Sequence, residues 1–316
     1  MSVDRRTWLA GVSTTIGCLA CERAAPRTAS EREPTPSEDR EPLPPGHEPP
    51  PSGLPIGDEP GQDLASFLTE PRRPITAERR TLELLPIGEY PRGFVVEYER
   101  VHLVRSPELE LLRRFASAWF GLPVRVAAAL SDELLETQAP QREFEGRRQF
   151  DAEALLGTLA PLRSPDAHSL LGLTLEDLWS PSLEGQWVFG LAAVERGLAI
   201  HSMLRYDPGL RSADERPPDF ERIIRDRGLR VLVHELGHLL GIRHCVHFCC
   251  VMNPTAGLAD LDRLPLRLCP ICLDKLNAAT GVDRLARALA LRDLYAELGM
   301  IVERDWMNAR IAEATP

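Results

Sequence analysis

The spacing of apolar residues switches repeatedly between strand-like and helix-like periods from residue 81 onward. Residues 94–102 are rich in Val, Tyr and Phe and predict a strand, as do residues 122–127. Between these strands an apolar stripe at helical spacing predicts a helix over residues 107–119. Residues 151–162 carry a second helical pattern.

The second half of the chain continues this mixture. Two apolar runs, residues 187–193 and 198–204, are joined by a short polar turn and predict a hairpin. A helix is expected over residues 219–240, with Gly228 as an alternative start, and another over residues 281–299. Strands interleaved with helices predict an α/β (α+β mixed) domain, a twisted mixed β-sheet covered by helices.

The composition changes sharply upstream of this pattern. Thirteen of the 28 prolines fall in residues 22–80, among many Glu, Arg and Ser residues and few aromatic ones. Such a segment buries too little apolar surface to offset its conformational entropy. The sequence therefore predicts a disordered tether over residues 22–80 and a folded domain over residues 81–316.

The first 21 residues have the features of an export signal. Arg5 and Arg6 precede a short apolar run, as in twin-arginine signals, and the run is too short to span a bilayer. Cys18 and Cys21 each lie in an imperfect lipobox, so either could be the lipidation site. We therefore expect an exported bacterial protein, periplasmic or membrane-anchored as a lipoprotein. Without a signal here the protein would stay in the cytoplasm.

The net charge of −10 argues against a nucleic-acid partner. Binding to phosphates needs clustered Lys and Arg, and the arginines of residues 205–230 are interleaved with acidic residues. A membrane contact is expected only through the N-terminal lipid, and no pattern in the sequence predicts an oligomeric state.

The expected helix at residues 219–240 ends in the motif H-E-x-x-H-x-x-G-x-x-H. Residues four apart lie on one helix face, so His234 and His238 present two imidazoles to one metal ion. Glu235 lies beside the first ligand, within reach of a water on that ion. A left-handed Gly241 would reverse the chain and bring His244 back as third ligand. Three histidines leave a fourth position open, as in catalytic zinc sites.

Five cysteines crowd into the 28 residues that follow the motif, beginning at Cys245. Two closely spaced pairs predict a closed, structural four-thiolate zinc site with these ligands: Cys245, Cys250, Cys269 and Cys272. Cys249 and His247 are neighbours, and either could replace one of these ligands. The same cysteines could instead form a redox-active C-x-x-C pair or disulfides, although twin-arginine export of an already folded chain would allow zinc to be loaded first.

Together these motifs resemble the archaemetzincin family, whose pattern is H-E-x-x-H-x-x-G-x-x-H-C, four residues, C-x-M and a later C-x-x-C. The match here is residue by residue, with a loop one residue shorter between Met252 and Cys269. Weaker similarities extend it over roughly residues 81–290, at residues 148–152, 171–174, 177–179 and 189–192. The resemblance implies a compact metzincin-like fold, two Zn²⁺ ions per chain, and Met252 as the Met-turn residue beneath the catalytic zinc.

The expected activity is zinc-dependent hydrolysis of peptide bonds in a peptide or protein substrate, by a zinc-activated water with Glu235 as general base. By analogy with metzincins, the substrate would extend along the strand edge near residues 189–192. The sequence does not decide between aminopeptidase and endopeptidase action. A non-catalytic zinc-binding module that recognises peptides, and a hydrolase acting on non-peptide amides, are the competing functional hypotheses.

Overall fold

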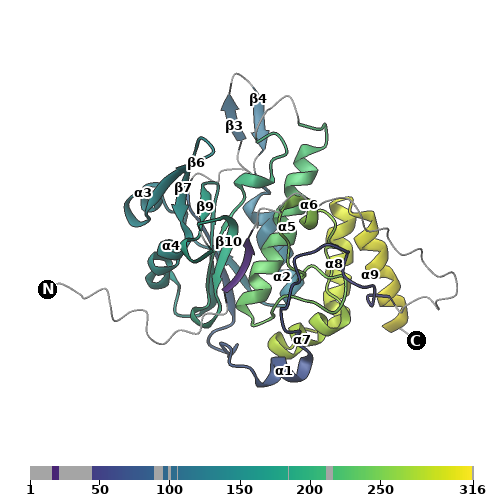
Figure 1. Ribbon diagram of the computed structural model, residues 1–316. Helices are drawn as coiled ribbons and strands as arrows, with labels where there is room; N and C mark the ends of the chain where they lie inside the picture. Colours follow the sequence, from purple (N-terminus) through teal and green to yellow (C-terminus); the bar gives the residue numbers. More distant parts are fainter. Residues whose placement is uncertain are drawn as a thin grey trace.

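The computed structural model describes residues 16–20, 45–88, 95–98, 101–104, 106–183, 185–210 and 216–314. Within these residues a nine-stranded mixed sheet forms the centre of the molecule (Figure 1). In spatial order its strands are β5 (Val124–Val126), β2 (Thr81–Pro86), β8 (Ala167–Thr174), β11 (Leu198–Ser202), β10 (Trp187–Ala193), β9 (Asp177–Trp179), β7 (Arg147–Asp151) and β6 (Gln141–Phe144), with β1 (Ile16–Ala20) paired to β10. The predicted mixed sheet is confirmed.

The pairing of the strands changes from parallel to antiparallel at β10. β5, β2, β8 and β11 pair in parallel, whereas β10 runs antiparallel to β11 and to β9. The predicted hairpin of residues 187–193 and 198–204 is therefore confirmed as β10 and β11, joined through a left-handed Gly197. β1 pairs antiparallel with β10 along residues 188–193, on the edge of β10 that faces away from β11.

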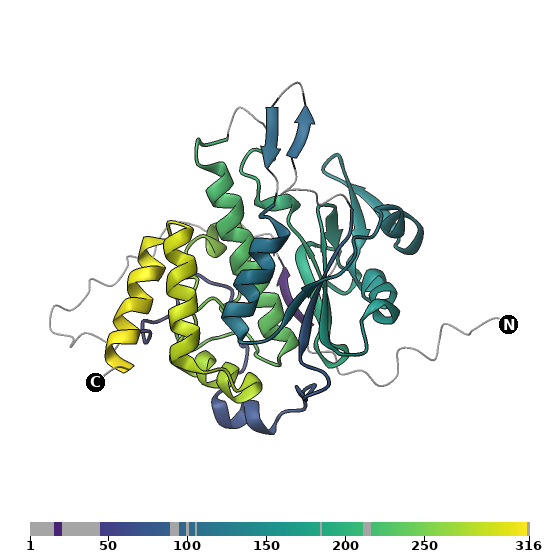
Figure 2. The same cartoon turned by 180° about the vertical axis from the view of Figure 1, so that it is seen from behind.

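Helices cover both faces of the sheet, because its central strands are apolar on both sides. On β8, Leu171 and Leu173 belong to one hydrophobic cluster and Leu170 to the other. The first cluster contains α2 (Leu109–Phe120) and α5 (Phe220–Leu239); the second contains α4 (Ala152–Leu159). Figures 1 and 2 show α4 on one side of the sheet and α5, α2 and α8 (Arg284–Glu297) on the other.

The predicted helices at residues 107–119, 151–162, 219–240 and 281–299 are confirmed as α2, α4, α5 and α8. Residues 94–102 form two strands instead of one, because β3 (Val95–Tyr98) and β4 (Val101–Val104) fold back on each other as a hairpin. The remaining helices are α1 (Leu64–Thr69), α3 (Glu133–Gln138), α6 (Leu258–Leu261), α7 (Pro270–Thr280) and α9 (Ile301–Ala314).

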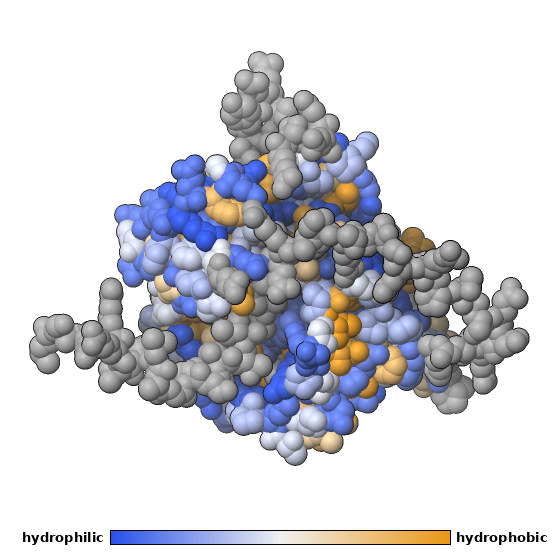
Figure 3. Space-filling view, in the orientation of Figure 1, coloured by the Kyte–Doolittle hydropathy of each residue, from blue (hydrophilic) through white to orange (hydrophobic). Residues whose placement is uncertain are grey.

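The described helices lack the length and apolarity that crossing a bilayer requires. On the face drawn in Figure 3 the surface is mainly hydrophilic, with an apolar patch on the side of α8 and α9.

The predicted disordered tether is wrong for residues 45–80, which we call the N-terminal strap. The strap lies along the side of the domain and leads through α1, beside α7, to β2 (Figure 1). Phe67 of α1 is fully buried, and the carbonyl oxygen of Arg73 lies 3.1 Å from His168 Nε2. A segment too polar to build its own core is thus ordered by packing on another part of the chain. Residues 22–44 and the predicted export signal, apart from the β1 backbone, lie outside the described residues.

Candidate metal centres

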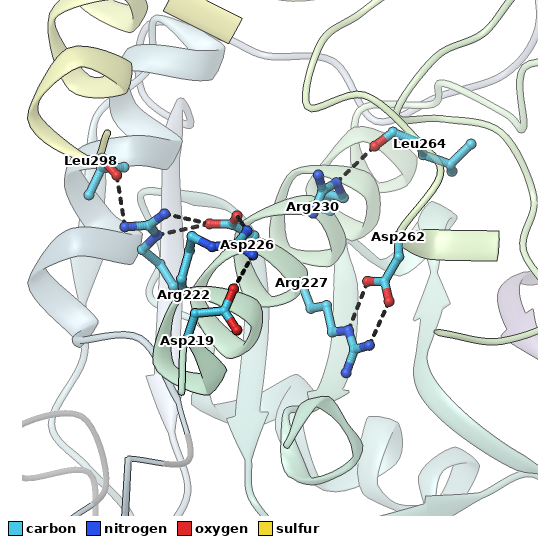
Figure 4. A network of polar contacts seen from close by, with 9 residues as sticks. Asp219, Arg222, Asp226, Arg227, Arg230, Asp262, Leu264 and Leu298 are labelled. Atoms are coloured by element: carbon cyan, nitrogen blue, oxygen red, sulfur yellow. Dashed lines mark hydrogen bonds and ion pairs between the residues drawn. The ribbon is translucent and has the colours of Figure 1, made fainter. Parts of the chain in front are cut away.

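The helix α5 that carries the motif is anchored along its N-terminal half by arginines (Figure 4). Arg227 donates to both carboxylate oxygens of Asp262, at 2.8 and 2.5 Å, and Arg230 donates to Leu264 O at 2.9 Å. Arg225 donates to Leu298 O, in the turn between α8 and α9, at 2.9 Å. These contacts hold the polar end of α5 and leave its buried C-terminal half against the sheet.

The chain reverses directly after α5, as predicted from Gly241. Gly241 has φ +87°, and its N–H donates to His238 O at 2.8 Å. The next N–H, that of Ile242, donates to Gly237 O at 3.1 Å. These two bonds form a Schellman motif, which ends the helix and turns the chain back toward it. The reversal places His244 beside the two helical histidines.

The side chains of His234, His238 and His244 converge, with one ring nitrogen of each within 4.8 Å of the others. Nδ1 of His234 donates to Val251 O and Nδ1 of His238 donates to Ile242 O, both at 2.8 Å. Nδ1 of His244 lies 3.0 Å from both carboxylate oxygens of Glu59. Each ring is thus held through Nδ1, and each Nε2 is directed at the centre of the cluster.

This arrangement fits a zinc ion. Carbonyl oxygens only accept, so Nδ1 carries the proton in His234 and His238, and their unprotonated Nε2 atoms face each other at 2.9 Å. Among the described residues, His244 Nε2 is buried without a hydrogen-bond partner. Burial also lowers the pKa of His234 to about 3, which keeps its ring in the neutral form that binds metals. A cation in the centre would satisfy all three lone pairs.

Glu235 follows His234 on α5 and is fully buried. Neither of its carboxylate oxygens has a hydrogen-bond partner among the described residues. Burial alone raises the pKa of Glu235 to about 8, and a cation held by the histidines would lower it again by favouring the ionised carboxylate. Gly190 of β10 lies against this side chain: a Cβ there would be in ordinary contact with Glu235 Cδ, at 3.4 Å, and would clash with Ile200 O, at 2.8 Å. The carboxylate therefore lies beside the sheet strand at which an extended substrate is expected.

A second cluster contains the four predicted cysteines, Cys245, Cys250, Cys269 and Cys272, with their Sγ atoms within 4.8 Å of one another. All four are buried and free, and the 3.6 Å between Cys245 Sγ and Cys269 Sγ is far from a disulfide bond length. The backbone N–H groups of Met252 and Cys269 point at Cys250 Sγ, at 3.5 and 3.3 Å. Four thiols supported in this way fit a closed tetrahedral zinc site. Cys249 and His247 lie outside this set.

Met252 lies beneath the helix, between the two clusters. A Cβ on Gly237 would meet its Sδ at 2.8 Å, so the thioether packs directly on α5 between the two histidine ligands. Its carbonyl oxygen accepts from Cys245 N at 2.7 Å. The Met252 side chain thus packs beneath α5, and its backbone connects the segment of His244 and Cys245 to the segment of Cys250.

The sequence reasoning missed several residues that hold these clusters. Asn253 is fully buried; its amide donates to Cys245 O at 2.5 Å, and its Oδ1 accepts from Cys250 N at 2.8 Å. Glu59 and Gln62 belong to the strap, and nothing in a proline-rich segment marks them as partners of a motif about 180 residues away. The adjacency of Asn253 to Met252 was the one available signal.

Comparisons with known proteins agree with this picture. The model of Peptidase family M54 matches residues 134–278. The archaemetzincin of Pyrococcus abyssi is 34% identical over 195 residues, which cover 61% of this chain and 93% of that protein. Archaemetzincin-2 of Homo sapiens is 27% identical over 253 residues, covering 73% and 68% respectively. The solved structure of the archaemetzincin from Methanopyrus kandleri aligns with 28% identity, 65% and 98% coverage, and a TM-score of 0.44.

Proposed function

Because the chain belongs to the archaemetzincin family and is therefore a zinc metallopeptidase, we propose that it cleaves peptide bonds at the three-histidine cluster with Glu235 as general base. Zinc held by His234, His238 and His244 would supply Lewis acidity toward the scissile carbonyl and acidify water. The observation that most supports this proposal is the Glu235 carboxylate next to His234 on α5: it is fully buried, and its two oxygens lack hydrogen-bond partners among the described residues.

In this proposal Glu235 performs both proton transfers. Its carboxylate accepts a proton from the attacking water and then passes that proton to the leaving amine, so that the carboxylate is regenerated. No side chain in the described part of the chain competes for this proton, since both oxygens are without hydrogen-bond partners there.

We further propose that the substrate main chain pairs with the edge of β10 that β1 occupies, in place of β1. β1 supports this proposal, because it already pairs antiparallel with that edge, opposite Leu191 and Ala192. A peptide adding to the same edge would gain main-chain hydrogen bonds and pass Gly190, which lies against Glu235. The second proposed metal, held by the four cysteines, would be structural, since four thiolates leave no open position.

The test is Glu235→Gln, which keeps the shape and polarity of the side chain but cannot accept a proton at neutral pH. We expect normal folding, unchanged zinc content and peptide binding, and a loss of turnover of about 10²- to 10⁴-fold, the usual contribution of general-base assistance. Glu221→Gln, an exposed change at the start of the same helix, is the matched control and should retain activity.

Two results would refute the proposal. If Glu235→Gln cleaved as fast as the parent, Glu235 would not be the base. If the parent bound members of a broad peptide library and cleaved none of them, the non-catalytic peptide-recognition module would be the better description.

A further inference from the structure

The third histidine differs from the other two in what holds its ring. Nδ1 of His234 and of His238 each faces a backbone carbonyl, whereas Nδ1 of His244 faces the carboxylate of Glu59, 3.0 Å from both oxygens. Glu59 belongs to the N-terminal strap, outside the motif and outside the region in which the sequence resembles the family.

We propose that Glu59 is a positioning residue for the catalytic zinc. Its carboxylate accepts a hydrogen bond from Nδ1–H of His244, which fixes the tautomer and directs Nε2 toward His234 and His238. A carboxylate behind a ligating histidine also raises the basicity of the ligand and strengthens metal binding. This inference rests on the proposed function, because it takes His244 as a zinc ligand.

The strap is held firmly enough to keep Glu59 in this place. Gln62, three residues further on, is buried; its amide donates to Gly241 O at 3.1 Å, and its Oε1 accepts from Arg243 N at 3.0 Å. Lys275 of α7 is fully buried and donates to Gln62 O at 2.8 Å. Gln62 thus connects the loop that carries His244 to the helix that begins at the cysteine cluster.

Between Glu59 and Gln62 the strap packs tightly on the domain. A Cβ on Gly61 would lie 2.7 Å from His247 Cε1, so the strap backbone lies directly on the loop after His244. The Glu59 side chain itself is 44% exposed, against 9% for His244. Removing this carboxylate should therefore alter the histidine far more than it alters the fold, since exposed ion pairs contribute little to stability.

The experiment measures zinc affinity at the exchangeable site of the full chain by competition with a chelator, and the visible spectrum after replacement of that zinc by Co²⁺. We expect Glu59→Ala to bind zinc about 10- to 100-fold more weakly, the usual effect of losing such a partner, and to shift the Co²⁺ spectrum. Glu59→Gln keeps an oxygen that accepts but loses the charge, so its affinity should fall between those of the parent and Glu59→Ala. Asp58→Ala, an exposed neighbouring change, is the matched control and should behave as the parent.

A double mutant separates a role through His244 from a general effect of the strap. In a His244→Ala background, Glu59→Ala should cause no further loss of zinc affinity, because the partner is already gone. Parent-like affinity and spectrum in Glu59→Ala, or an equal loss in Asp58→Ala, would overturn the inference and leave the proposed function intact. A parent without an exchangeable zinc that depends on His244 would overturn both.

Discussion

The three histidine rings differ in whether a mutation can remove the group that holds them in place. Backbone carbonyls support His234 and His238, so no side-chain substitution removes those acceptors. Only the acceptor behind His244 is a side chain, that of Glu59. On the proposal made above, the metal affinity of this cluster would be tunable from the strap without any change to the motif itself.

Gly237, between the two helical ligands, is a second sensitive position. In Gly237→Ala the new Cβ would lie 2.8 Å from Met252 Sδ and force the thioether away from the helix. Overpacking of this kind typically costs about 1–3 kcal/mol, more than the gain of about 0.4–1 kcal/mol from replacing a helical Gly by Ala. We expect this loss in the free energy of unfolding measured with denaturant, together with weaker zinc binding, since Met252 also bonds to Cys245.

Gly157→Ala in α4 is the matched control for that change. Its Cβ meets nothing within 4 Å, and Ala in place of a helical Gly usually stabilises by about 0.4–1 kcal/mol through the unfolded chain. If both variants changed stability in the same direction and by the same amount, the contact between Gly237 and Met252 would have no energetic weight.

At this scale the sequence predicted the ligands and missed their supports for one physical reason. His234, His238 and His244 are brought together by helix periodicity and one Gly turn, which are local rules. Glu59 and Asn253 act through tertiary contacts, which no spacing in the sequence encodes.

Among the elements, those with a strong one-sided pattern were predictable. α2 buries a single stripe, so its helical period is visible in the sequence. β8 is buried at all eight positions, on both faces of the sheet, and therefore lacks the alternation of apolar and polar residues that marks a half-buried strand. α9 has Met307 as its only buried residue within the described part of the helix, and Val302 is 70% exposed, so its periodicity is weak.

The strap shows that composition alone does not predict whether a segment is ordered. Its prolines and charges correctly indicate that it has no core of its own, but it contributes Phe67 to the core of the domain. Order in such a segment depends on a surface built by distant residues, here α7 and the loop after α5.

This dependence predicts different behaviour for two shortened chains. Of the described contacts, residues 45–316 lose only the pairing of β1 with β10 and should keep most of the full chain's free energy of unfolding. Residues 81–316 lose the buried Phe67, worth about 1.5–3 kcal/mol, and leave Lys275 without Gln62, which costs about 1–3 kcal/mol more. We therefore expect a loss of roughly 2.5–6 kcal/mol in the free energy of unfolding. Equal stability of the two shortened chains would contradict the structural role of the strap.

Across the whole molecule, the two clusters are adjacent in sequence yet suited to different tasks. His244 and Cys245 are consecutive, and Cys245 N donates to Met252 O at 2.7 Å, so one short segment contributes to both. In the proposed centres, three histidines would leave one coordination position of the zinc open, whereas four thiolates would leave none. An open site exchanges its metal with solvent more readily than a closed thiolate site, whose binding energy is also folding energy.

The purified full chain should accordingly contain two zinc ions, one removed by mild chelation and one retained. His244→Ala should bind the exchangeable ion more weakly and keep most of its secondary structure by circular dichroism. Cys272→Ser should lose the retained ion and unfold in large part, because structural zinc contributes about 10–16 kcal/mol in zinc-finger peptides and the buried sulfurs would be left without it. The opposite order of damage would reverse the roles assigned to the clusters. A single zinc per chain, with disulfides between Cys245, Cys250, Cys269 and Cys272, would show that the thiols serve as covalent cross-links and that only the histidines bind metal.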